Sequence, residues 1–122
     1  MMYEKRTLSP RITLNGKLHS ITISKDVVRL LGLPSHVCIM RNLDGRSLAV
    51  RPCDEKEYLS LEVPEFESWK RNKHLRIYST EFVREFLVHN GCDESETLTM
   101  PGEYDPKNNA VIFQKIPENT TK

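Results

Sequence analysis

A change of hydrophobic period at Ser24 constrains the fold of this chain more than any other feature of its sequence. Before it, Ile21 and Ile23 alternate with polar residues, as in a strand with one buried face. After it, the apolar residues within 27–31 follow helical spacing, and Gly32 can adopt the left-handed conformation that ends a helix. Serine caps helices by accepting a hydrogen bond from a free N–H group of the first turn. The sequence therefore predicts a strand followed directly by a short helix capped by Ser24.

Turn signals on both sides of this helix predict hairpins. Residues 11–14 and 18–23 form two strand pieces, and Asn15-Gly16 between them is typical of a two-residue turn. Behind the helix, residues 37–50 form a second hairpin that turns at Asp44-Gly45.

The same order of strand, helix and hairpin recurs in the second half of the chain. Residues 75–78 alternate, Ser79 offers a cap, and Gly91 offers a stop. A hairpin over 97–113 follows, with a longer loop rich in Pro, Gly, Asp and Asn. Four positions match at an offset of 55: Ser24, Asp26, Val28 and Arg29 fall on Ser79, Glu81, Val83 and Arg84. The strands before them match only after a slip of one residue.

The expected fold class is mainly β with short helices (α+β), built from two repeats. One such unit of about 45 residues cannot bury enough apolar surface alone, whereas two copies can cover each other. The alternative is an accidental recurrence of common elements. The expected division of the chain is a flexible arm (1–10), a first repeat (11–53), an acidic linker (54–68), a divergent second repeat (69–115) and a tail (116–122).

Charge is segregated along a chain whose net charge is only +1. Residues 1–53 carry nine Lys and Arg against three Asp and Glu, whereas residues 54–68 carry one against six. No apolar run approaches the length of about 20 residues that spans a membrane, and the first ten residues contain no signal-peptide core. We therefore expect a cytoplasmic protein with no membrane partner.

Little in the sequence points to a cofactor, a metal ion or catalysis. Cys38, Cys53 and Cys92 make an odd count without a CxxC pair, which indicates reduced thiols. The four histidines lie far apart, and no phosphate-binding or nucleophile motif is present. We expect no enzyme activity, no cofactor and no metal. The open alternative is a small β-barrel enzyme that uses His36 and Cys38.

The run ITLNGKLHSITISKDVVRLLGL, residues 12–33, resembles the AbrB/MazE/SpoVT swapped-hairpin family, and the tandem arrangement resembles that of MraZ-like proteins. The resemblance implies that two copies exchange hairpins into one barrel-like core, supplied here as a pseudo-dimer by a single chain. It differs at four positions. His19 aligns with the turn glycine of the family pattern. Ser24 replaces the usual proline before the helix, and Ser20 and Val28 align with arginines of the family pattern.

The resemblance also implies binding of duplex DNA by a transcriptional regulator. Family members present basic residues from the first strands, the turn and the helix start. Lys and Arg bind phosphates and release condensed counterions, whereas Asn and Arg can read base edges. The candidate DNA-binding residues are Arg11, Asn15, Lys17, His19, Lys25 and Arg29 in the first half, and Lys70, Arg71, Lys73 and Arg76 in the second.

Three alternatives to DNA binding remain open at this point. These charges could only solvate strand faces, as most surface Lys and Arg do. The chain could be an antitoxin-like or other protein-interaction module on the same fold, with a protein partner such as a toxin. It could also form a homodimer by exchange between two chains.

Overall fold

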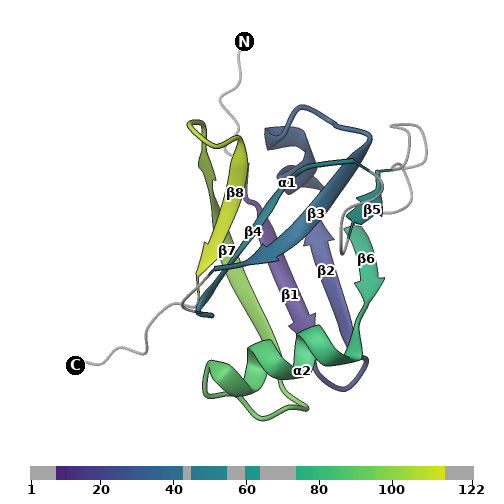
Figure 1. Cartoon of the computed structure of the whole chain (residues 1–122), viewed down its shortest axis with the longest axis vertical. Helices are drawn as coiled ribbons and strands as arrows, with labels where there is room; N and C mark the ends of the chain where they lie inside the picture. The colour runs from purple at the N-terminus through teal and green to yellow at the C-terminus, as the bar shows by residue number, and fades with distance from the viewer. Residues whose placement is uncertain (1–7, 43–44, 55–59, 64–73, 115–122) are drawn as a thin grey trace, which may run out of the picture.

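The computed structural model describes residues 8–42, 45–54, 60–63 and 74–114. In these residues most of the regular structure is strand, and the strands form one sheet that curls into a nearly closed barrel (Figure 1). This confirms the expected mainly β class with short helices. In chain order the elements are β1 (Arg11–Asn15), β2 (Ser20–Ser24), α1 (Lys25–Leu30), β3 (His36–Arg41), β4 (Ser47–Pro52), β5 (Ser60–Glu62), β6 (His74–Tyr78), α2 (Thr80–His89), β7 (Thr97–Asp105) and β8 (Ala110–Gln114).

The strand order of the sheet is β5-β3-β4-β8-β7-β1-β2-β6, and the neighbouring strands are antiparallel. Strand β7 joins the two parts of the sheet. Its first residues, Thr97 to Pro101, pair with β1, and its last residues, from Gly102 to Asp105, pair with β8. Gly102 suits this junction because a Cβ atom there would collide with the ring of Phe113.

The core lies inside the curled sheet because alternate strand residues point inward. Figure 1 shows α2 at the lower ends of β1 and β2, and α1 toward the upper end of the strands. Both helices contribute buried residues on one face. The core side chains are Ile12, Leu14, Ile21, Ile23, Val27, Val28, Leu31, Val37, Ile39, Leu48, Val50, Leu61, Leu75, Phe82, Val83, Phe86, Leu87, Met100, Val111 and Phe113.

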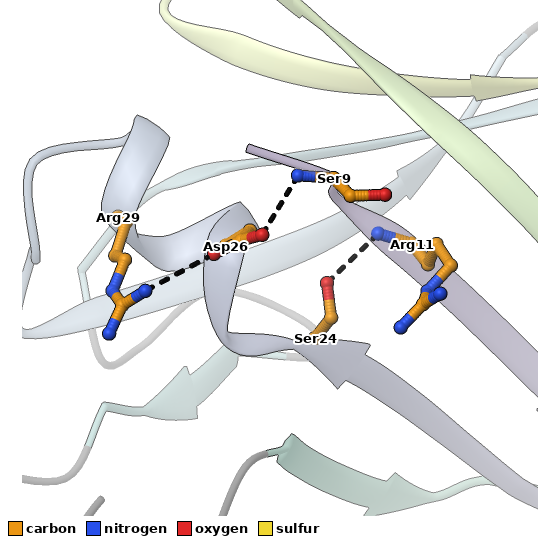
Figure 2. Close-up of polar contacts among 5 residues, drawn as sticks. All are labelled: Ser9, Arg11, Ser24, Asp26 and Arg29. Atoms are coloured by element: carbon orange, nitrogen blue, oxygen red, sulfur yellow. Dashed lines mark hydrogen bonds and ion pairs between the residues drawn. The ribbon is translucent and has the colours of Figure 1, made fainter. Parts of the chain in front are cut away.

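Both helices occur where the period changes, but only one has the expected cap. The Ser79 side chain accepts a hydrogen bond from the Phe82 N–H at 3.4 Å. The expectation that Ser24 caps α1 is wrong: its hydroxyl accepts instead from the Arg11 N–H of the neighbouring strand at 2.9 Å (Figure 2). Gly32 and Gly91 follow the helices with φ of 83° and 81°, which confirms the expected left-handed stops.

The turn between β1 and β2 differs from the expected two-residue turn. β1 continues to Asn15 and β2 begins only at Ser20, so four residues connect them. The Gly16 N–H donates to the Glu96 carbonyl at 2.8 Å, which ties the turn to the segment before β7. His19 rather than Gly16 takes the left-handed conformation, with φ of 56°. The Asn-Gly prediction failed because a distant backbone partner holds Gly16.

Strand β5 lies within the range expected to be an acidic linker, 54–68. It pairs with β3, and its central residue Leu61 reaches the core. Three residues are too few to display a clear period in the sequence. Of the expected arm, residues 8–10 are described. The Ser9 N–H donates to Asp26 at 2.8 Å, and the Pro10 carbonyl accepts from the Gly102 N–H at 2.9 Å. The expected tail, 116–122, is outside the described residues.

Candidate nucleic-acid interface

The outer face of the four neighbouring strands β7, β1, β2 and β6 is polar. Since Ile12 and Leu14 of β1 point into the core, the residues that alternate with them point outward. Strand register then aligns these residues in rows across the face. The middle row, read from β7 to β6, consists of Thr99, Thr13, Thr22 and Arg76. We call this surface the outer face.

A groove with a cavity volume of about 410 Å³ runs over the outer face. Eight of its nine lining residues carry a hydroxyl, amide or guanidinium group, and the ninth, Leu18, contributes from the turn. Such a lining offers hydrogen-bond donors and acceptors beside the methyl and methylene groups of the same side chains. The lining residues are Arg11, Thr13, Asn15, Leu18, Ser20, Thr22, Ser24, Arg76 and Thr99.

Hydrogen bonds between neighbouring strands fix the floor of the groove. The hydroxyls of Thr13 and Thr99 lie 3.0 Å apart, and Arg76 Nε donates to Thr22 Oγ1 at 3.3 Å. Ser20 is only 2% exposed although it is polar. The floor is therefore a prearranged set of hydroxyls, with the Arg76 guanidinium held over one side of it.

The two arginines of the groove have no carboxylate within ion-pair distance among the described residues. In the part of the chain that the structure describes, neither Arg11 nor Arg76 forms an ion pair. Arg29, in contrast, lies 3.4 Å from Asp26 on α1 (Figure 2). A guanidinium outside an ion pair can bind a phosphate bidentately without first separating from a carboxylate.

The structure brings together some of the sequence-predicted site residues. Arg11, Asn15 and Arg76 all line the groove, and Lys17 and His19 belong to the turn at its end. Lys25 and Arg29 lie on α1, which begins where β2 ends, and neither lines the groove. The remaining three predicted residues, Lys70, Arg71 and Lys73, lie outside the described residues.

The hydroxyl residues of the groove were not predicted from the sequence. Thr13, Thr22 and Ser24 alternate with the core residues of β1 and β2, so period-two spacing could have identified them. Thr99 could not be found this way. It reaches the groove only because β7 pairs with β1, across 86 positions of sequence.

The segment before β7 supports the turn at the end of the groove. Besides the bond from Gly16 to Glu96, backbone atoms of Glu94 pack directly against Gly16. Within this segment the Ser95 N–H and hydroxyl donate to Asp93 and hold the pKa of that carboxyl below its usual value. These two hydrogen bonds favour the charged form of Asp93 and join it to Ser95 within the segment.

Neither metal binding nor nucleophilic catalysis gains support from the arrangement of reactive groups. Among the residues that the structure describes, no three His, Cys, Asp or Glu side chains lie close enough together to hold a metal ion. His36 contacts the Ser35 hydroxyl at 3.2 Å, and Cys38 is buried. A buried thiol is not exposed to a substrate.

Replacing Ser24 with alanine is expected to destabilise the contact between β1 and β2 beside the groove, and not the helix α1. The change removes the acceptor of the Arg11 N–H and should lower the free energy of unfolding by about 0.5–1.5 kcal/mol. Ser79→Ala, the matched control, removes a true helix cap and should cost about 1 kcal/mol. Urea denaturation followed by circular dichroism gives both values. Amide exchange at Arg11 should accelerate only in Ser24→Ala, and equal exchange in the two variants would contradict this assignment.

Comparisons of the chain with protein-family models, with curated proteins and with solved structures found no match. Neither α1 nor α2 is long and apolar enough to cross a membrane, and these are the helices of the described residues.

Proposed function

We propose that the chain is a cytoplasmic AbrB-like transcriptional regulator that binds duplex DNA on the outer face. The observation that carries the proposal is a pair of guanidinium groups, Arg11 and Arg76, that line a groove with several hydroxyls and form no ion pair with any described residue. Hydroxyl, amide and guanidinium groups are the usual donors to phosphate oxygens. Lys17 and His19 extend the donor set beyond the end of the groove.

The strand pairing supports the finer part of the proposal, a swapped-hairpin pseudo-dimer in one chain. Suppose that β1 to β4 with α1 form one repeat, and that β5 to β8 with α2 form the other. The strand after each helix then pairs with the first strand of the other repeat: β7 with β1, and β3 with β5. Exchange of this kind is what a swapped hairpin requires.

Two further pairings support an approximate twofold axis between the repeats. β2 pairs with its counterpart β6, and β4 pairs with its counterpart β8. In the first pair Ile21 faces Ile77 and Ile23 faces Leu75, so Thr22 and Arg76 occupy the centre. Thr22 and Arg76 are 54 positions apart, one fewer than the offset of 55 that relates the two helices. This difference is the slip of one residue that is needed to match the strands in the sequence. The axis would pass through the outer face, as in proteins that bind two DNA half-sites.

A protein-interaction module of the antitoxin type, without DNA binding, is the second candidate. The observation in its favour concerns the two positions that align with arginines of the family pattern. Ser20 is almost completely buried at the floor of the groove and Val28 is fully buried, so neither position extends a side chain outward as an arginine would. DNA binding here would depend on Arg11 and Arg76 instead.

A salt titration of binding to a fluorescein-labelled duplex of random sequence tests the proposal. The logarithm of the binding constant should fall linearly with the logarithm of salt concentration, with a slope of about −0.9 for each phosphate contacted. Arg11→Ala and Arg76→Ala should each reduce the size of the slope by about 1, because each removes one phosphate contact. Fluorescence anisotropy between about 50 and 200 mM salt covers the range in which such slopes are measured.

Lys107→Ala is the charge-matched control for this titration. Lys107 lies in the turn between β7 and β8, outside the groove, and should leave the slope unchanged. Absence of binding at the lowest salt concentration would reject the DNA-binding proposal in favour of the interaction module. An equal loss in all three variants would reject the outer face as the interface.

A further inference from the structure

Tyr78 is a large apolar side chain exposed on an otherwise polar surface. It is 63% exposed at the end of β6, two residues after Arg76. Residues two apart on a strand share one face of the sheet, so the ring and the guanidinium lie on the same side. Register places Tyr78 opposite Ser20, which lines the groove. The aromatic ring therefore stands beside the end of the groove.

Leu18 adds a second exposed apolar side chain at the same end. It is 54% exposed and lines the groove from the turn that follows β1. The Asn15 side chain accepts from the Leu18 N–H at 3.0 Å and fixes this part of the turn. In the strand register Asn15, Ser20 and Tyr78 form one row across β1, β2 and β6. The turn with Leu18 lies next to that row.

The chemistry of the outer face changes in order along the strands. At one end Tyr78 and the neighbouring Leu18 add apolar groups beside the polar Asn15 and Ser20 of the same row. The next row carries Thr13, Thr22 and Arg76, and the row beyond contains Arg11. Successive rows on one face are about 7 Å apart, because a strand rises about 3.4 Å per residue. A nucleotide carries similar chemical groups in the same order over a comparable length: an apolar ring, a hydroxylated sugar and a phosphate.

We propose that the groove binds a nucleotide of an unpaired nucleic-acid strand, with its base stacked on Tyr78. The base contacts Tyr78 and Leu18, the sugar lies over the threonine hydroxyls, and the phosphates bind Arg76 and Arg11. This inference rests on the proposed function in one respect, namely that the outer face binds nucleic-acid phosphates.

An unpaired strand fits the apolar end better than a duplex does. In a duplex each base already stacks on its neighbours, so an exposed ring on the protein gains little from it. An unpaired base stacks on an aromatic ring whatever its identity, since every base has a π-face. The positive charge of Lys17, beyond the groove, favours a strand that continues past one nucleotide over a free mononucleotide.

Anisotropy titrations of the full chain with labelled oligo(dT), and separately with labelled duplex, test this assignment. Tyr78→Ala should weaken oligo(dT) binding on the order of tenfold and change duplex binding less than about twofold, because only the unpaired strand stacks on the ring. Tyr78→Phe keeps the ring and should retain the wild-type affinity. Arg76→Ala should weaken both ligands. Circular dichroism checks that the Tyr78 variants, altered at an exposed position, remain folded.

The outcomes separate this inference from the proposed function. Binding of duplex without binding of oligo(dT), or equal affinity of wild type and Tyr78→Ala for oligo(dT), would overturn the inference and leave the regulator proposal standing. Binding of oligo(dT) without duplex would support the inference and reject the duplex proposal. Thymidine monophosphate should compete only weakly with oligo(dT). Competition as strong as that of unlabelled oligo(dT) would overturn the unpaired strand as the ligand.

Discussion

Replacing Phe86 with alanine is expected to lower the free energy of unfolding by about 3–5 kcal/mol. Phe86 lies in the second half of α2, is fully buried, and is one of the two largest completely buried side chains among the described residues. Its carbonyl oxygen also accepts from the Asn90 side chain at 2.9 Å, and that side chain in turn donates to the Gly45 carbonyl. The residue therefore connects the helix to the core and to the turn between β3 and β4.

Urea denaturation followed by circular dichroism measures this loss directly. Val88→Ala is the matched control on the same helix, because Val88 is 57% exposed and its truncation should change stability by about 0.5 kcal/mol or less. A domain at the low end of the usual range, with an unfolding free energy of about 5 kcal/mol, keeps little or no stability after the Phe86 change. A loss below about 1 kcal/mol would contradict the packing of α2 against the barrel.

Replacing Gly16 with alanine is expected to destabilise the chain by about 1–3 kcal/mol and to weaken nucleic-acid binding. A Cβ atom at Gly16 would collide with backbone atoms of Glu94, which cannot rotate away as a side chain can. The turn must then move, and the 2.8 Å bond from its N–H to Glu96 is lost. Because Lys17, Leu18 and His19 follow directly, their displacement should reduce affinity as well as stability.

Gly32→Ala separates this steric effect from the general cost of replacing glycine. Gly32 has φ of 83° and open space around its Cα, so alanine there suffers only the left-handed backbone cost of about 1 kcal/mol. Thermal unfolding gives the stability of both variants, and anisotropy gives their affinity for labelled duplex. Only Gly16→Ala should also expose the amide of residue 16 to rapid exchange. Protection of that amide in Gly16→Ala would contradict the contact with the segment before β7.

Local sequence signals predicted the elements but not the partners that hold them. The change of period identified both helices, because periodicity reflects one face of one element. The role of Ser24 could not be predicted in this way. A serine before a helix satisfies the capping rule, but here its hydroxyl accepts a hydrogen bond from the N–H of Arg11, 13 positions earlier. Asn15-Gly16 is a similar case, since Glu96 lies 80 positions away. In both cases a hydrogen bond to a distant backbone group replaced the interaction that the local sequence favours.

Charge predicted part of the candidate site, and strand register supplied the rest. Arg11, Asn15 and Arg76 were selected from the sequence as groups that could bind nucleic acid, and all three line the groove. Charge could not distinguish them from Arg29, which an aspartate one helical turn away partly neutralises. Nor could it identify Thr99 or Tyr78, because uncharged residues become part of the site only when β7 joins β1 and β6 joins β2.

The pairing of the sheet also has a consequence for how the chain can fold during its synthesis. Strand β1 leaves the ribosome before the other strands of the sheet, yet one of its two neighbours, β7, is made only after β2 to β6 and both helices. Strand β4 likewise pairs with β8, and β2 pairs with β6, and both of these partners are translated later. Until those strands emerge, only the β1–β2 hairpin and the small unit β5-β3-β4 can form, and an isolated two-stranded hairpin is marginal in water. The strands β1 to β4 therefore form a nascent segment with open edges, and the barrel-like sheet is completed only after β7 and β8 have been translated.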